Sequence, residues 1–137
     1  VWGAPPDEGT FQTRYGRHPR HRTKFSSKVT IGKEAVTHFG VTHRLGDFSR
    51  VEVDLETGRT HQIRVHFADA GFPLLSDEVY GSKKSIRVDV MSRQALHAWK
   101  ISFPHPRTGR RVRFTAPIPA DFSKAQKRLS AMGKKSK

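Results

Sequence analysis

Residues 57–66, TGRTHQIRVH, decide how this chain is expected to fold. They follow an alternating run, VEVDLE at residues 51–56, in which apolar side chains share one face and acids the other. That period is typical of a half-buried strand. From Arg59 onward the apolar residues recur every three or four positions, as in a helix, and Gly71 is placed to end it. The sequence therefore predicts a strand that leads through a Thr-Gly turn into a helix over residues 60–70.

The first turns of this predicted helix carry an unusual set of polar residues: Arg59, His61, Gln62 and Arg64. Free backbone N–H groups and the positive end of the helix dipole favour an anion at such a position. A guanidinium binds phosphate through paired, charge-assisted hydrogen bonds. The residues therefore indicate a site for an anionic ligand.

The same block, GRTHQIRVH at residues 58–66, resembles the signature of the RluA-type RNA pseudouridine synthases. Further segments on both sides fit the family in the family's order. They are GRHP (16–19), RTK (22–24), GKEAVT (32–37), GFPLL (71–75), Asp77, Tyr80-Gly81, Arg93, LHA (96–98) and FPHPRTG (103–109). The resemblance covers about residues 1–122. It has two departures, since Phe72 stands where the family has His and Ser76 where the family has Gly.

The resemblance implies both a reaction and a fold. Members of the family cut the glycosidic bond of a uridine, rotate the base and rejoin it through carbon, without a cofactor or metal. The target base must leave its stack, so the enzyme needs phosphate contacts and a pocket for the flipped base. The chain would be part of a pseudouridine synthase catalytic domain of α+β class, with a mixed, largely antiparallel sheet and a helix on one face. Its substrate would be ribosomal or transfer RNA.

Two residues that carry the family's chemistry are expected to lie outside this chain. They are an Asp in an H-R-L-D-x-x-T-S-G-type motif and a base-contacting Tyr in a Y-x-A-type strand, both of which precede the segment matching residues 1–3. We therefore expect residues 1–122 to form the C-terminal portion of the catalytic domain and residues 123–137 a basic C-terminal helix or tail. The chain alone should be inactive without the missing N-terminal half. The alternative is a non-catalytic RNA-binding or ribosome-associated protein derived from the same fold.

By resemblance, Arg64 takes the position of the basic residue that pairs with the catalytic Asp. An adjacent guanidinium keeps a carboxylate ionised because the positive charge lowers the carboxylate's pKa. The alternative for Arg64 is a surface ion pair with Glu56 or Asp54. Arg59 and His61 are expected to line the cleft and hold RNA, or else to satisfy backbone carbonyls at the start of the helix.

One segment offers a nucleophile inside the chain. Residues 43–47, HRLGD, are similar to H-R-L-D with one residue inserted, which would make Asp47 the nucleophile of a permuted enzyme. A hairpin turn is favoured, because Gly46-Asp47 is good turn chemistry between an apolar-rich strand at residues 36–45 and the strand at residues 50–56. No Thr-Ser-Gly follows.

Composition bounds the class of protein. The chain has 137 residues, 34% of them hydrophobic, with a formal net charge of +14 and no cysteine. Such a length forms one modest core, and part of that core's surface is expected to be completed by a missing half or a partner. Disulfides and thiolate metal sites are excluded. No apolar run reaches the ~20 residues of a membrane span, so we expect no membrane association and a cytoplasmic location.

The basic residues occur in two blocks. Residues 14–33 hold seven Lys or Arg and no acid, and residues 107–137 hold ten against the single Asp121. Separate basic blocks are the electrostatic footprint of a polyanion-binding protein, so RNA is the expected partner. In the first block the residues expected to contact RNA are Arg17, Arg20, Arg22 and Lys24. The final segment, residues 133–137, is expected to be a solvated tail.

The other elements follow from local patterns. Residues 1–24 are expected to be loop, residues 25–31 a strand, and residues 96–103 with 111–115 a hairpin. A helix is expected to begin at Asp121 or Ser123 and to run to about Met132.

The histidines do not indicate a metal site. His61 and His66 are five residues apart, whereas two ligands on one helical face are four apart, and no H-E-x-x-H is present. We therefore expect no bound metal and no other cofactor.

Overall fold

A computed structural model of the chain describes residues 1–135, with the side chains of residues 133–135 excluded. In this part of the chain the elements are β1 (Glu8–Arg17), β2 (Phe25–Ser26), β3 (Lys33–Leu45), β4 (Phe48–Leu55), α1 (Gln62–Asp69), α2 (Lys83–Arg87), β5 (Lys100–Pro104), β6 (Arg111–Thr115) and α3 (Ala120–Lys135). The predicted α+β class, with a largely antiparallel sheet and a helix on one face, is confirmed.

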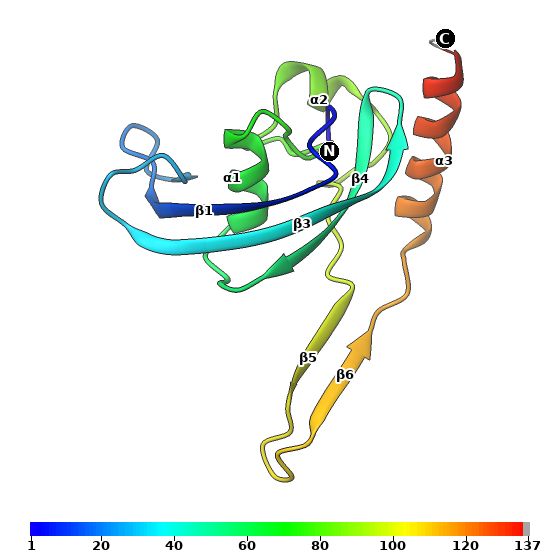
Figure 1. Cartoon of the computed structure of the whole chain (residues 1–137). Coiled ribbons are helices and arrows are strands. Elements are labelled where there is room, and N and C mark those ends of the chain that lie inside the picture. The colour runs from blue at the N-terminus through cyan, green and yellow to red at the C-terminus, as the bar shows by residue number, and fades with distance from the viewer. Residues whose placement is uncertain (136–137) are drawn as a thin grey trace.

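The main sheet is antiparallel and has the strand order β2-β1-β3-β4. Its long central strand β3 pairs with both β1 and β4, and α1 lies across one face (Figure 1). Strands β5 and β6 form a separate hairpin that extends away from this body, and α3 lies beside the end of the β3–β4 hairpin. The sheet and α1 therefore form the frame in which the polar residues of the 57–66 segment are held.

The predicted strand and helix around the 57–66 segment are both confirmed. Strand β4 begins at Phe48, two residues earlier than expected, and α1 covers the inner part of the predicted helix. The end of the strand differs from the expectation, because Leu55 is 43% exposed whereas the neighbouring inward residues Val51 and Val53 pack against the core.

The prediction of a loop over residues 1–24 is wrong, because β1 occupies ten of these residues. The apolar positions Phe11 and Tyr15 on its inner face are separated by Thr13, and exposed residues alternate with them. The threonine interrupts the hydrophobic alternation by which a strand is recognised. Its hydroxyl is used inside the protein, as the next paragraph describes.

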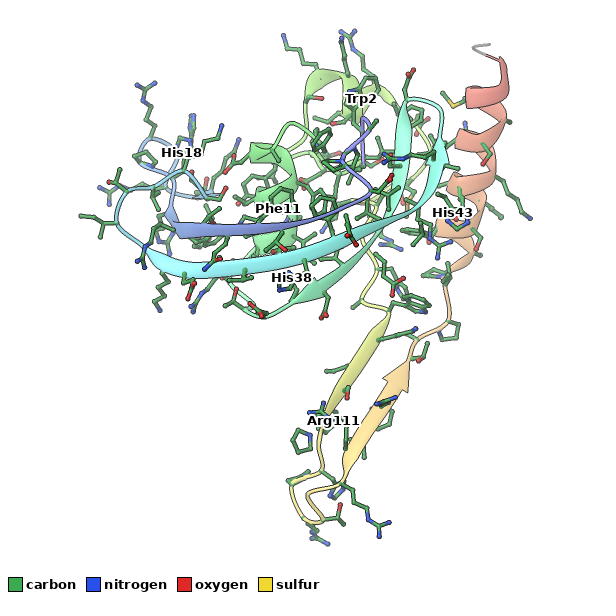
Figure 2. The ribbon with its side chains drawn as sticks, viewed as in Figure 1. Trp2, Phe11, His18, His38, His43 and Arg111 are labelled. Atoms are coloured by element: carbon green, nitrogen blue, oxygen red, sulfur yellow. The ribbon has the colours of Figure 1, made fainter. Side chains whose placement is uncertain are left out.

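Helix α1 is attached to the sheet by a buried histidine. The ring of His66 is 1% exposed, and its Nε2 and Nδ1 atoms each lie 2.7 Å from a threonine hydroxyl, Thr13 on β1 and Thr37 on β3. Phe67 packs beside it against Phe39 and, edge to face, against Phe11, which Figure 2 shows on β1 next to α1. A buried polar group without a partner is costly, so these two hydrogen bonds fix both the depth and the rotation of the helix.

Other predicted strands and helices are present but begin or end at different residues. The strand predicted for residues 25–31 is reduced to Phe25–Ser26, and Ile31 is 92% exposed. The hairpin of residues 96–103 and 111–115 is confirmed, with its first strand shortened to Lys100–Pro104. The expected C-terminal helix is longer and begins at Ala120, so the expected boundary at residue 122 falls inside it. Its Leu129 packs into the core, whereas the side chains of the 133–137 tail lie outside the described residues.

The interpretation of Gly46-Asp47 as a hairpin turn is confirmed. Leu45 pairs with Phe48 across the turn, and Gly46 has a φ of 68°, in the left-handed region that glycine adopts without strain. Asp47 is exposed on this turn.

We expect the His66 contact to make stability depend on pH. Burial lowers the pKa of His66 below its ordinary value, although Asp69 opposes the shift. The imidazole is therefore protonated near pH 6.5 in the unfolded chain but only at lower pH in the folded protein. The contribution of His66 to the free energy of unfolding is fully present above about pH 6.5 and is lost as the pH falls toward the folded-state pKa. Urea unfolding between pH 7.5 and 5.5 should show this loss. His66→Gln, which keeps one donor and one acceptor, should flatten the slope.

The matched control is His43→Gln, since His43 is exposed on β3. An unchanged slope in His66→Gln, or a slope equally flattened in the His43 variant, would contradict the assignment.

Candidate active site

The start of α1 is built by one buried glutamine. Gln62 is 3% exposed, and its side-chain amide donates to Val36 O (3.1 Å) and Thr37 Oγ1 (2.8 Å) on β3. Its Oε1 accepts hydrogen bonds from Thr57 Oγ1 (2.7 Å) and Arg59 N (2.9 Å). Two of these bonds reach the turn before the helix and two reach β3, so the Gln62 side chain links the turn to the sheet. Gln62 is therefore a structural residue within the polar set, and it anchors the start of the helix that carries Arg64.

Arg64 forms an ion pair with Asp77. The guanidinium donates side-on, from Nε to Asp77 Oδ2 (2.8 Å) and from Nη2 to Asp77 Oδ1 (2.9 Å). The Arg64 side chain is 12% exposed and that of Asp77 is 1% exposed. The ion pair considered from the sequence, with Glu56 or Asp54, is not the one that forms.

Asp77 is held from a second side as well. Its Oδ1 also accepts the backbone N–H groups of Val79 and Tyr80, each at 3.1 Å. Burial alone would raise the pKa of Asp77, but the hydrogen bonds from Arg64 and from these two N–H groups outweigh it and lower the pKa. The bond to Asp77 likewise raises the pKa of Arg64, against the effect of burial. Both groups are charged at neutral pH.

Tyr80 connects Arg64 to His61. The Arg64 guanidinium lies over the Tyr80 ring, 5.0 Å from the ring centroid, and the Tyr80 hydroxyl lies 2.8 Å from His61 Nδ1. The same hydroxyl accepts the N–H of Phe25 at 3.0 Å. Burial and the nearby Arg64 lower the pKa of His61, which favours its neutral form. A neutral Nδ1 accepts a hydrogen bond from the Tyr80 hydroxyl, so the ring proton of the exposed His61 side chain lies on Nε2 and can be donated to another group.

A row of aromatic contacts extends from this cluster to the basic residues of the first block. The ring of Phe25 lies 5.9 Å from the His61 ring, and the Arg17 guanidinium lies 5.4 Å from the Phe25 centroid. Arg17 also donates to Arg22 O (2.8 Å), which closes the turn formed by residues 18–24, here called the basic loop. The loop is ordered by His18, whose backbone N–H donates to Lys24 O and whose side-chain Nδ1 accepts the backbone N–H groups of Arg20 and His21.

The structure thus brings several of the predicted residues together and separates others. Arg64 and His61 meet at Tyr80, and Arg17 adjoins them through Phe25. Arg59 donates from Nε to Glu34 O (3.0 Å), so it is Arg59, rather than His61, that satisfies a backbone carbonyl. Arg20, Arg22 and Lys24 lie on the basic loop; the first two are exposed and Lys24 is half-buried. Figure 2 shows His18 of this loop at the opposite side of the sheet from the hairpin that carries Arg111.

The residues that sequence reasoning missed are the partners of the predicted ones. Asp77 and Tyr80 were both noted only as part of the resemblance. The separations of 13 and 19 residues that bring them to Arg64 and His61 follow from the tertiary fold. Within residues 1–135 no group of three or more His, Asp or Glu side chains is arranged to hold a metal ion. In the same residues no helix is both long and apolar enough to cross a membrane.

The two departures from the family pattern have structural consequences. Phe72 packs in the cluster of Phe39, Phe67 and Leu74. Ser76, directly before Asp77, has a φ of 59°, in the left-handed region that disfavours a residue with a Cβ atom. This explains why a glycine suits that position.

Comparison of this sequence with known proteins finds matches to one family. The family model described as RNA pseudouridylate synthase matches residues 2–69. An uncharacterized RNA pseudouridine synthase of Chloroflexus aurantiacus is 48% identical over 122 residues, which are 89% of this chain and 38% of that protein. Ribosomal large subunit pseudouridine synthase D of Neisseria meningitidis serogroup B is 46% identical over 128 residues, covering 88% of this chain and 34% of its own length.

A solved structure agrees with these matches. The structure described as human RNA Pseudouridylate Synthase Domain Containing 1 superposes with a TM-score of 0.72 at 28% identity, covering 86% of this chain and 51% of that chain. The chain therefore spans less than half the length of the two curated relatives.

We expect Ser76→Gly to stabilise the protein. The substitution relieves a left-handed residue of a strain worth ~1–2 kcal/mol, and the greater freedom of glycine in the unfolded chain returns about half of that. The net gain should be about 0.5–1 kcal/mol in the free energy of unfolding, measured by denaturant titration. Ser92 is exposed and does not have a positive φ, so Ser92→Gly should destabilise instead. A loss of stability in Ser76→Gly would show that the serine contributes a contact that outweighs the strain.

Proposed function

The chain belongs to the RNA pseudouridine synthase family, and we propose that it is the C-terminal portion of an enzyme that isomerises uridine to pseudouridine in ribosomal or transfer RNA. The observation that carries this proposal is the half-buried Arg64, held by Asp77 and joined through Tyr80 and His61 to a basic loop. A fixed guanidinium beside a surface that binds phosphates is what the reaction requires.

In this proposal Arg64 pairs with the nucleophilic aspartate and keeps it ionised. That aspartate would belong to the part of the protein that precedes residue 1, as the greater length of the relatives allows. Asp77 is a poor candidate for it, because both of its oxygens already accept hydrogen bonds, four in all. Asp47 is a poor candidate as well, because it is exposed on the β3–β4 turn.

The basic loop and its neighbours would hold the RNA. Arg20, Arg22 and Lys24 belong to an ordered loop that leads into Phe25, whose ring contacts both His61 and Arg17. Arg59 lies two residues before His61 and donates to Glu34 O on β3. Phosphate contacts from such side chains position a nucleic acid without reading its sequence. His61, exposed at the start of α1, is the group of the cluster best placed to reach a bound nucleotide.

The missing N-terminal half is proposed to complete the domain. The β5–β6 hairpin carries exposed apolar residues on one face, with Ile101 59% and Phe114 58% exposed. Exposed apolar side chains on a hairpin that extends from the body of the protein favour burial against another part of the protein. The alternative function, a non-catalytic RNA-binding protein, would use the basic loop in the same way but would leave the ion pair without a chemical role.

We expect Arg64→Ala to separate chemistry from binding. In the full-length protein it should lower kcat for pseudouridine formation by at least about 100-fold, as loss of a preorganised charge does. The Kd for the same RNA should stay nearly unchanged. Tritium release from uridine-tritiated ribosomal and transfer RNA measures the first quantity, and filter binding measures the second. Equal losses in both would contradict the proposed role.

Neutralising the basic loop should have the opposite effect. Arg20→Gln, Arg22→Gln and Lys24→Gln together should weaken RNA binding and reduce the slope of log K against log salt by about 2, at ~0.7 per phosphate contact. Arg17 is left in place because it holds the loop closed. The matched control removes three charges from α2, where Lys83, Lys84 and Arg87 are exposed. An equal effect in the control would assign binding to overall charge rather than to the basic loop.

A further inference from the structure

The β5–β6 hairpin has two faces of different chemistry. Cross-strand partners project to the same side of a two-stranded ribbon, and successive residues of a strand alternate between its sides. One face carries the apolar pairs, Ile101 with Phe114 and Phe103 with Val112. The opposite face, here called the basic face, carries the alternate pairs, Lys100 with Thr115, Ser102 with Arg113 and Pro104 with Arg111. Arg111 Nη1 donates to Ser102 Oγ at 2.9 Å, as side chains on one face can.

The positive charge of this hairpin is not balanced by acids. Residues 90–120 contain no Asp or Glu. Five exposed cations lie on the basic face or at the tip of the hairpin: Lys100, Arg107, Arg110, Arg111 and Arg113. None of the five forms an ion pair within residues 1–135, whereas Arg44, Arg64 and Arg93 each pair with an acid in the same part of the chain. Exposed cations grouped in this way attract a polyanion.

The tip of the hairpin is held in one conformation by His105. The backbone N–H of His105 donates to Arg110 O at 2.8 Å, and its carbonyl accepts the Gly109 N–H at 2.9 Å. Its side-chain Nδ1 accepts the Arg107 N–H at 3.1 Å. The backbone that carries Arg107 and Arg110 is therefore ordered before anything binds, which lowers the entropic cost of binding.

The positions of the aromatic residues indicate which form of RNA the basic face fits. Single-stranded nucleic acid is held by aromatic side chains that stack on bases along a basic groove. On this hairpin Phe103 and Phe114 lie on the apolar face and stack on each other, with ring centroids 5.9 Å apart. Trp99, at the base of the hairpin, has the ammonium of Lys100 over its ring, 3.9 Å from the centroid. The basic face thus offers charges and hydroxyls without stacking rings, which suits the phosphates and 2′-hydroxyls of an A-form helix.

The basic face is remote from the basic loop. The hairpin extends away from the body of the protein (Figure 1), and Figure 2 shows Arg111 on it at the opposite side of the sheet from His18 of the basic loop. A base that leaves its stack to react would lie near α1 and the basic loop. An RNA that contacts both surfaces must therefore place a different segment on the hairpin.

We propose that the basic face and tip of the β5–β6 hairpin bind a double-helical segment of the RNA, outside the segment that carries the target uridine. This inference rests on the proposed function, which makes RNA the partner. The contacts go to phosphates and so do not read sequence. Two separate contacts with one RNA reinforce each other through effective concentration, so the hairpin raises the affinity for a long, folded RNA without changing the site itself.

The triple variant Arg107→Gln, Arg110→Gln and Arg113→Gln tests the proposal in the full-length protein. Arg111 stays in place because it joins the two strands through Ser102. The probes are an RNA duplex of about 20 base pairs, long enough for a protein that spans successive grooves, and an oligouridylate of the same length. Filter binding over a series of salt concentrations measures the Kd for each.

We expect the triple variant to bind the duplex about tenfold more weakly, because each exposed charge contributes modestly. The slope of log K against log salt for the duplex should fall by about 2–3, at ~0.7–0.9 per phosphate contact. The Kd for the oligouridylate should stay nearly unchanged. If the triple variant does not fold, Arg113→Gln alone should lower the duplex slope by ~0.7–0.9, and an unchanged slope in that variant would overturn the proposal.

The matched control removes three charges elsewhere, by changing Lys83, Lys84 and Arg87 of α2 to Gln. An equal loss of duplex binding in this control would assign the effect to overall charge and overturn the proposal. An equal loss for duplex and oligouridylate in the hairpin variant would overturn it as well. An unchanged duplex affinity would also overturn it, and the basic face would then fit an acidic protein surface instead.

Tritium release by the wild type, measured in parallel, keeps this inference separate from the proposed function. A wild type that releases no tritium but binds the duplex through the hairpin would overturn the proposed enzyme and support the inference. An active wild type whose duplex binding does not depend on the hairpin would overturn the inference alone.

Discussion

The ion pair between Arg64 and Asp77 is the contact on which the arrangement of the site depends. The side chain of Asp77 is 1% exposed and that of Arg64 is 12% exposed, so the Asp77 charge cannot return to water when Arg64 is removed. Leaving one member of a buried pair unpaired costs about 3–5 kcal/mol, a large part of a typical domain's stability. The folded chain must therefore bring α1 and the turn of residues 76–81 together. A left-handed φ at Ser76 is tolerated next to this pair.

The need to pair buried polar groups applies along the whole of α1. The helix buries Gln62 and His66 together with Val65 and Phe67, so its inner face is half polar. Each buried polar group finds a defined partner on the sheet, Gln62 at Val36 and Thr37 and His66 at Thr13 and Thr37. Hydrogen bonds have a narrower geometry than apolar contacts. The polar face therefore determines the register of helix on sheet, and with it the position of Arg64.

Much of the frame could be predicted from the sequence, because β4, α1 and the β5–β6 hairpin follow local periods of two and of three to four residues. Strand β1 could not, since Thr13 occupies an inward position where a strand pattern requires an apolar residue. Thr13 points inward because its hydroxyl forms a hydrogen bond with His66, which is 53 residues away in the sequence. Arg64 was predicted to pair with an aspartate outside this chain, with a surface ion pair to Asp54 or Glu56 as the alternative. Its partner within the described residues is Asp77, 13 residues away, whereas Asp54 and Glu56 remain exposed. Local patterns determine elements, whereas the pairing of buried polar groups is settled only by the assembled fold.

The ion pair also determines how a second anion would be recognised. Arg64 and Asp77 together carry no net charge. Arg64 donates to Asp77 from Nε and Nη2, so a carboxylate or phosphate that approaches Nη1 meets a neutral pair rather than an isolated cation. The attraction then depends mainly on the alignment of the N–H groups, and less on distance-dependent charge alone. Long-range attraction of RNA would fall instead to the basic loop, whose exposed charges are screened by salt and act over a Debye length of about 10 Å. The two tasks need different surroundings. Precise orientation requires burial and a fixed partner, whereas attraction of a polyanion requires exposed charges without acids nearby. The aromatic row of Phe25, His61 and Tyr80 places these two surroundings side by side without mixing their charges.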